Sequence, residues 1–119
     1  EASYSLLPDS LKGRVFMALL VYMTAADPAE AERIAVELVE RRLAAGVNIL
    51  APMRSVYRWK GEVRKAGEIP LVAQSEEERF PALAACVREL HSYETPCIIA
   101  VPIAAGTTDF LDWIAACTA

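Results

Sequence analysis

The sequence contains no apolar run of the roughly 20 residues that a membrane-spanning helix requires. The apolar stretch VFMALLVYM at 15–23 ends at Thr24 and is typical of a buried strand instead. With 119 residues, the chain has the length of one domain with its own core. We therefore expect a single compact domain and no membrane partner.

Basic clusters are missing as well, because 12 Lys and Arg residues are dispersed among 16 Asp and Glu residues and the net charge is −4. Nucleic-acid binders usually carry a basic patch, so nucleic acid is not expected as a partner. The three cysteines, Cys86, Cys97 and Cys117, form no CxxC pair, and their odd number argues against a disulfide framework. A cytoplasmic location is the simplest expectation.

Common catalytic motifs are also absent, since there is no glycine-rich phosphate loop and no GxSxG sequence. His91 is the only histidine, and nothing in the sequence marks Cys86 or Cys97 as an activated thiol. We therefore predict that the protein is not an enzyme. General-base catalysis by His91, with Glu94 orienting its ring, is the lowest-ranked alternative.

Apolar residues, by contrast, are abundant. They make up 55% of the chain, and the mean hydropathy of +0.27 is high for a domain this small, whose large relative surface demands polar residues. Part of the apolar surface is therefore expected to be buried against other subunits.

Hydrophobic periodicity predicts a strand at 15–24 and then an amphipathic helix at 28–44. Asp27 is expected to cap this helix and Gly46 to end it. The later elements are predicted to be a helix that begins close to Pro81 and ends before Tyr93, a strand at 97–103 and a short helix at 107–117.

Between the two longer helices, the stretches 47–64 and 68–75 have strand-like compositions and predict a long hairpin. Gly61 and Gly67 are the turn candidates between them. Two prolines interrupt these stretches: Pro52 predicts a bend or bulge, and Pro70 predicts an edge position.

This order of elements predicts an α+β fold, the ferredoxin-like βαββαβ sandwich with both helices on one face of the sheet. The long hairpin joins its second and third strands, and a short helix follows the last strand. The domain is expected to span 14–119, with 1–13 as an N-terminal tail, either native or added by cloning. The tail lacks the basic start and small-residue cleavage site of a secretion signal.

His91, Tyr93 and Glu94 form the only local cluster of potential metal ligands or acid–base groups. Cys86 would add a thiolate, but on an ideal helix it lies about 140° around the axis from His91. The same residues also fit a structural role, in which His91 binds the last carbonyls of its helix and Tyr93 anchors the turn.

Tyr57 and Trp59 are two residues apart on the predicted hairpin, so they share one strand face, while Arg58 and Lys60 point the other way. Such an aromatic pair lines a ligand pocket or a subunit seam. Ordinary cross-strand packing is the alternative.

The sequence resembles the CutA family, named for divalent-cation tolerance, in three segments: ERIAVELVERRLAAGVNILAPMRSVYRWKGEV, ERFPALAACVRELHSYETPCIIAVPI and TDFLDWI. The resemblance implies a ferredoxin-like subunit in a tight homotrimer, with hairpin strands that pair across subunits. It also implies binding of Cu(II) and similar divalent ions, and an architecture similar to that of the PII signalling proteins.

The resemblance carries over to individual residues. His91 and Glu94 match the family's LHPYE block, and Cys86 falls where some members also have a cysteine; these three are the metal-ligand candidates. The residues that the resemblance places around the intersubunit cleft are Tyr57, Trp59, Glu62 and Tyr93. A nitrogen and oxygen site of this kind would favour Cu(II) over Zn(II), whatever its biological metal.

Three departures from the family pattern matter for these assignments. Gly46 stands where the family usually has cysteine, which removes a candidate thiolate, and Ser92 replaces the proline after the histidine. Ala73 and Gln74 lack the charge of the family's Lys-Thr pair, so a role of that lysine does not transfer.

Two functions therefore lead the interpretation of the sequence. The first is a CutA-like trimeric protein that binds divalent metal ions, copper above all in vitro, in the response to these ions. The alternative is a PII-like signalling or small-ligand-binding module that uses clefts between subunits. A scaffold in which the aromatic residues and His91 serve packing alone ranks below both.

Overall fold

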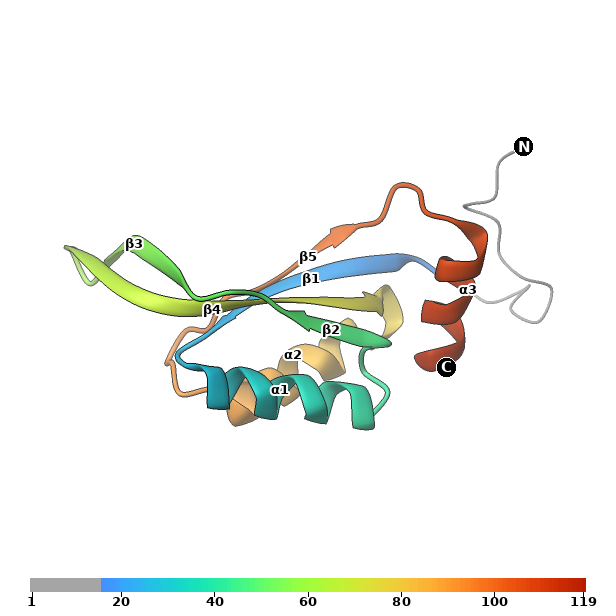
Figure 1. Ribbon diagram of the computed structural model, residues 1–119, viewed down its shortest axis with the longest axis horizontal. Helices are drawn as coiled ribbons and strands as arrows, with labels where there is room; N and C mark the ends of the chain where they lie inside the picture. The colour runs from blue at the N-terminus through green and yellow to red at the C-terminus, as the bar shows by residue number, and fades with distance from the viewer. Residues whose placement is uncertain (1–15) are drawn as a thin grey trace.

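The computed structural model describes residues 16–119, which form the predicted succession of strands and helices (Figure 1). The expected tail at 1–13 lies outside the described residues. No helix within 16–119 is long and apolar enough to cross a membrane. The elements are β1 (Ala18–Ala25), α1 (Pro28–Glu40), β2 (Gly46–Ile49), β3 (Met53–Trp59), β4 (Glu62–Glu76), η2 (Glu77–Arg79), α2 (Phe80–Leu90), β5 (Ile98–Pro102) and α3 (Thr108–Cys117).

The strands form an antiparallel sheet in the order β2, β4, β1, β5, and β3 pairs with β4 beyond the end of β2. Figure 1 shows α1 and α2 side by side along one face of this sheet, over a buried apolar core. Val21 and Met23 of β1 point into this core, whereas Leu20 and Tyr22 alternate with them and lie on the opposite face. The predicted class, α+β with an antiparallel sheet, is confirmed.

Helix α1 begins as predicted but ends differently. The Oδ1 atom of Asp27 accepts a hydrogen bond from the Glu30 N–H at 2.8 Å, which caps the helix. After Glu40, Arg42 adopts a left-handed backbone with φ 58°, and the Leu43 N–H donates back to the Leu38 carbonyl at 2.9 Å. The prediction that Gly46 ends the helix is therefore wrong, because Gly46 is the first residue of β2.

A two-residue turn joins β3 to β4. Lys60 and Gly61 both have positive φ, at 50° and 82°, as a type I′ hairpin turn requires, and Trp59 pairs with Glu62 across it. Gly61 is therefore a turn glycine, but Gly67 is not. Gly67 lies inside β4 opposite Arg54, so the second hairpin strand begins at Glu62 and is 15 residues long.

The predictions for the two prolines of the hairpin have different outcomes. Pro52 lies between β2 and β3, where residues 50–52 face only residues 69–70 of β4, so the predicted bend or bulge near Pro52 is confirmed as one extra residue. The edge position predicted for Pro70 is wrong, because β4 lies between β2 and β1, and Pro70 is in register with Thr24. The Pro70 carbonyl accepts from the Leu50 N–H at 2.9 Å. In an antiparallel strand, the N–H and the carbonyl of one residue point to the same neighbouring strand. For Pro70 this is the side where β2 ends, so the absence of an N–H removes no hydrogen bond between β4 and β1.

The sheet face opposite α1 and α2 carries exposed apolar side chains. Neighbouring positions of β1 and β5 place four of them together, between 36% and 55% exposed: Leu20, Tyr22, Ile99 and Val101. Val56 and Val63 of the hairpin are 66% and 62% exposed, and their pairing with Lys65 and Arg58 places them on the hairpin face opposite Tyr57 and Trp59. The free sheet face and the hairpin therefore both expose apolar side chains.

Candidate functional site

The β3–β4 hairpin extends beyond the rest of the sheet (Figure 1). Residues of this hairpin line part of a pocket of about 560 Å³. β1, both hairpin strands and the segment after α2 all contribute to its wall. The pocket brings together four of the predicted site residues: Tyr57, Trp59, Tyr93 and Glu94. Its lining also includes Tyr22, Thr24, Met53, Arg64, Glu68 and Cys97.

Strand alternation explains which hairpin residues reach the pocket. Met53, Tyr57 and Trp59 are an even number of residues apart, so they share one face of β3. Arg64 lies opposite Tyr57, and Glu68 lies opposite Met53, which puts both on the same face of the hairpin. The Tyr22 hydroxyl, 3.8 Å from the Met53 sulfur, joins β1 to this surface.

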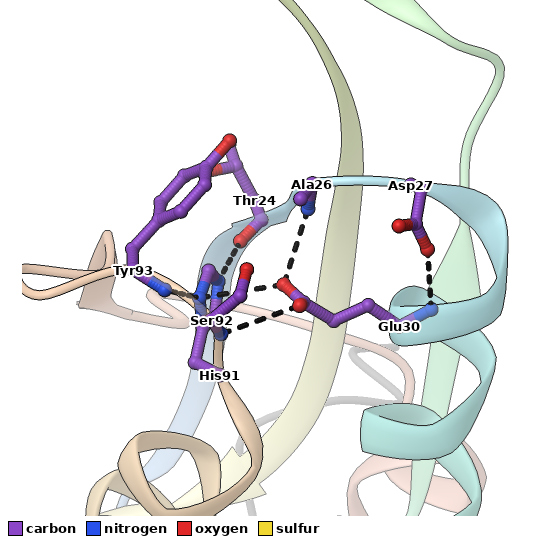
Figure 2. A network of polar contacts seen from close by, with 7 residues as sticks. All are labelled: Thr24, Ala26, Asp27, Glu30, His91, Ser92 and Tyr93. Atoms are coloured by element: carbon purple, nitrogen blue, oxygen red, sulfur yellow. Dashed lines mark hydrogen bonds and ion pairs between the residues drawn. The ribbon is translucent and has the colours of Figure 1, made fainter.

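His91 lies behind the pocket wall rather than in the pocket. Its side chain is 0% exposed. Nε2 lies 2.6 Å from the Thr24 carbonyl oxygen, and Nδ1 accepts from the Tyr93 N–H at 3.0 Å (Figure 2). Because Nδ1 accepts from the Tyr93 N–H, Nε2 is the nitrogen that donates to the Thr24 carbonyl. The ring therefore binds a carbonyl of β1 and not the last carbonyls of its own helix.

The Glu30 carboxylate, in the first turn of α1, completes this network. Oε2 accepts from the Ala26 N–H at 3.1 Å and lies 3.3 Å from His91 Nδ1, while Oε1 accepts from the Ser92 N–H at 3.3 Å (Figure 2). Glu30 is buried, and a helix N-terminus stabilises its charge. The network fixes the segment 91–93 against β1 and α1, and thereby positions Tyr93 in the wall of the pocket.

Tyr93 meets Glu68 inside the pocket. Burial, together with the charge of Glu68 and a hydrogen bond to it, raises the pKa of Tyr93 to about 12. The Tyr93 hydroxyl is therefore protonated at neutral pH and donates a hydrogen bond to the Glu68 carboxylate. Burial, and then the charge of Glu68, also raise the pKa of the Cys97 thiol, so this cysteine stays in its neutral form.

Charged groups line the mouth of the pocket. The Lys60 ammonium lies 5.7 Å from the centroid of the Trp59 ring and 3.8 Å from the carboxylate of Glu94, whose side chain is 75% exposed. The Arg64 guanidinium lies 3.4 Å from the Glu62 carboxylate. Glu62, expected around the cleft, is thus next to a lining residue but is not itself part of the lining.

The three candidate metal ligands do not converge within the described chain. His91 has both ring nitrogens engaged, Glu94 is beside the pocket with an exposed side chain, and Cys86 of α2 is buried in the core. Burial raises the pKa of the Cys86 thiol. Among residues 16–119, no group of three or more His, Cys, Asp and Glu side chains is arranged to hold a metal ion. One described chain therefore does not supply a complete ligand set.

Sequence reasoning missed Glu30, Glu68 and Cys97 as parts of this site. Strand alternation from Glu62 would have placed Glu68 on the pocket face, once the turn was fixed at Lys60 and Gly61. The sequence offers no comparable signal for Glu30, because it looks like any other charged residue at the start of α1.

Gly46, the departure from the resemblance at the start of β2, lies against α3. A Cβ atom at this position would be 2.9 Å from the Gln74 Oε1 atom and 3.1 Å from the Trp113 ring. The indole therefore occupies the space that a side chain would need. The cysteine usual in the family does not fit here unless Trp113 or Gln74 moves.

A family model described as CutA1 divalent ion tolerance protein matches residues 19–117. The divalent-cation tolerance protein CutA of Archaeoglobus fulgidus is 45% identical over 94 residues, which is 79% of this chain and 91% of the relative. Its counterpart in Thermus thermophilus is 43% identical over 98 residues, or 82% of this chain and 95% of the relative. A solved structure of the periplasmic divalent cation tolerance protein CutA from A. fulgidus superposes with a TM-score of 0.84 at 42% identity and covers 87% of this chain and 100% of that chain.

Proposed function

Because this chain belongs to the CutA1 divalent ion tolerance family, we propose that it acts in divalent-cation tolerance by binding divalent ions, without an enzymatic step. The pocket is the observation that supports a binding role. It gathers the carboxylates of Glu68 and Glu94, which are oxygen donors for divalent ions.

The proposed assembly is a homotrimer of ferredoxin-like subunits. The βαββαβ order and the antiparallel sheet support this topology. The exposed apolar side chains of the free sheet face and the hairpin support burial against neighbouring copies, because a small soluble domain rarely leaves such a surface in water. Neighbouring copies would also bring further ligands to each pocket.

The metal ligands in this proposal are Glu94 together with donors from the pocket or from a neighbouring subunit. The sequence-based set of His91, Glu94 and Cys86 remains a prediction. Direct binding through His91 would require one ring nitrogen to leave the Thr24 carbonyl or the Tyr93 N–H. Binding through Cys86 would require the thiol to leave the core and lose its proton.

Native mass spectrometry of the metal-free protein, titrated with Cu(II), tests assembly and stoichiometry together. We expect a trimer that takes up three ions, one for each subunit, and a loss of uptake in Glu94→Gln. Glu32→Gln removes the same charge from the exposed side of α1 and serves as the matched control. A trimer without specific uptake contradicts the metal proposal, and a monomer contradicts the assembly. His91→Gln and Cys86→Ser in the same titration test the sequence-based ligand set.

A second candidate, a PII-like signalling or small-ligand-binding module, is favoured by one observation. The pocket is lined by the aromatic side chains of Tyr22, Tyr57, Trp59 and Tyr93, and sites for organic ligands are typically lined in this way. Quenching of Trp59 fluorescence by an organic metabolite, without quenching by Cu(II), would support this candidate over the first.

The proposed location is the cytoplasm. Cys86, Cys97 and Cys117 are all free thiols, which suits a reducing compartment. Because the A. fulgidus structure is described as periplasmic, cell fractionation of the native organism is the direct test. Recovery of the protein with periplasmic markers would contradict the proposal.

A further inference from the structure

One carboxylate in the pocket lacks a cationic partner among residues 16–119. Arg64 is paired with Glu62, and Lys60 is paired with Glu94, but the partner of Glu68 is the neutral hydroxyl of Tyr93. Glu68 is half-buried at the position where β4 passes the pocket. A carboxylate partly removed from water is stabilised by a nearby cation, so this position favours a positively charged ligand.

The rings around Glu68 favour the same kind of ligand. Tyr22, Tyr57, Trp59 and Tyr93 line the pocket, and the negative faces of aromatic rings attract cations. The chain already shows this chemistry at the pocket mouth. There, the Lys60 ammonium lies over the Trp59 ring and beside a carboxylate.

The charge and the size of the pocket distinguish an organic cation from a metal ion. Tyr93 and Cys97 are neutral at physiological pH, so the charged groups of the lining are Arg64, Glu68 and Glu94. Arg64 and Glu94 are paired with Glu62 and Lys60, which leaves the charge of Glu68 without an ion-pair partner among residues 16–119. A monocation matches that charge, whereas a divalent ion needs more anionic ligands. The volume of about 560 Å³ also lies in the range of small-molecule sites, roughly 300–1,000 Å³.

We propose that this pocket binds a small organic ammonium ion, with its charged group at Glu68 and its apolar body among the rings of Tyr22, Tyr57, Trp59 and Tyr93. The proposal rests on the second candidate function, a small-ligand site, and requires no metal ion. The ammonium would donate to the Glu68 oxygen that the Tyr93 hydroxyl leaves free.

Benzylammonium and benzyl alcohol are suitable probes, because they share size and ring and differ in charge at pH 7. The protein is the full chain in its native assembly with Trp113→Phe, which leaves Trp59 as the only tryptophan, and EDTA removes metal ions. We expect benzylammonium to change Trp59 fluorescence saturably, with a Kd at least tenfold lower than that of benzyl alcohol. Isothermal titration calorimetry with unsubstituted Trp113 checks that the background substitution is neutral.

Glu68→Gln is the decisive variant, since the amide keeps an acceptor for the Tyr93 hydroxyl and removes only the charge. We expect it to raise the Kd of benzylammonium at least tenfold and to leave benzyl alcohol unaffected. Glu32→Gln on α1 is the control for net charge and should change neither constant. Equal affinity for the two probes, or an unchanged Kd in Glu68→Gln, overturns the proposal. Saturable binding of benzyl alcohol alone would keep the small-ligand function and reject the ammonium, whereas binding of neither probe would reject both.

Discussion

The two faces of the sheet carry similar side chains but have different coverage. Leu71 of β4 faces α1 and α2 and is 0% exposed, whereas Val101 of β5 lies on the free sheet face and is 52% exposed. Alternation along the strands therefore divides the apolar residues into two sets. One set is buried by the chain's own helices and stabilises the fold, and the other remains available for a second copy or a ligand.

The largest expected effect comes from the covered face. Leu71→Ala removes a fully buried side chain from a packed core, so we expect the free energy of unfolding to fall by about 3 kcal/mol. Val101→Ala removes a similar group from the free sheet face and should cost no more than about 0.5 kcal/mol in a monomer. Urea unfolding of both variants at one protein concentration measures the difference.

The dependence of these two stability losses on protein concentration distinguishes the two faces further. If copies of the chain cover the free sheet face, the cost of Val101→Ala should grow with protein concentration, because association contributes to the measured stability. The cost of Leu71→Ala should not depend on concentration in the same way. Equal, concentration-independent costs would mean that the two faces do not differ as the fold indicates.

A smaller loss is expected from the network behind the pocket. His91→Ala leaves the Thr24 carbonyl and the Tyr93 N–H without their partner in a buried setting, which we expect to cost about 2 kcal/mol. Ser92→Ala is the matched control, because its bond to Glu30 comes from the backbone N–H and is retained. Thermal unfolding of both variants is the measurement, and an unchanged midpoint in His91→Ala would mean that the ring is not engaged as described.

The contacts of His91 illustrate which features the sequence predicts and which it does not. The order of elements, the Asp27 cap and the start of α2 close to Pro81 follow from local patterns, and the structure agrees with them. The partners of His91 come from 67 and 61 residues earlier in the chain, Thr24 and Glu30, and no local pattern predicts such contacts.

The hairpin shows the same limit. The sequence pattern divides β4 at Gly67, a turn candidate, and predicts an edge position for Pro70, because both residues interrupt strand patterns. Their tolerance depends on the neighbouring strands: Gly67 pairs with Arg54, and Pro70 lies where β2 ends. The extent of β4 therefore depends on its register with the neighbouring strands, which the preferences of single residues do not predict.

A substitution of Gly46, which lies between the sheet and α3, is expected to have an intermediate effect on the free energy of unfolding. Gly46→Cys would bring a Cβ atom within 3.1 Å of the Trp113 ring and even closer to Gln74, so we expect overpacking to cost about 1–2 kcal/mol. Trp113→Ala opens the space, and the double variant should lose less stability than the sum of the two single variants. Urea unfolding of the four proteins forms a double-mutant cycle. Strict additivity would show that the indole does not occupy this space.

The smallest expected effect concerns the pocket and appears at high pH. Free tyrosine ionises near pH 10, while Tyr93 in the folded state ionises near pH 12. The unfolded state therefore loses its proton first, and the contribution of Tyr93 to stability, complete below pH 10, falls as the pH rises towards 12. The difference in absorbance at 295 nm between the parent protein and Tyr93→Phe should titrate near pH 12. Glu68→Gln should lower this midpoint only in part, because burial is the first cause of the shift, and a parent midpoint near 10 would contradict the pairing of Tyr93 with Glu68 on which the pocket's charge depends.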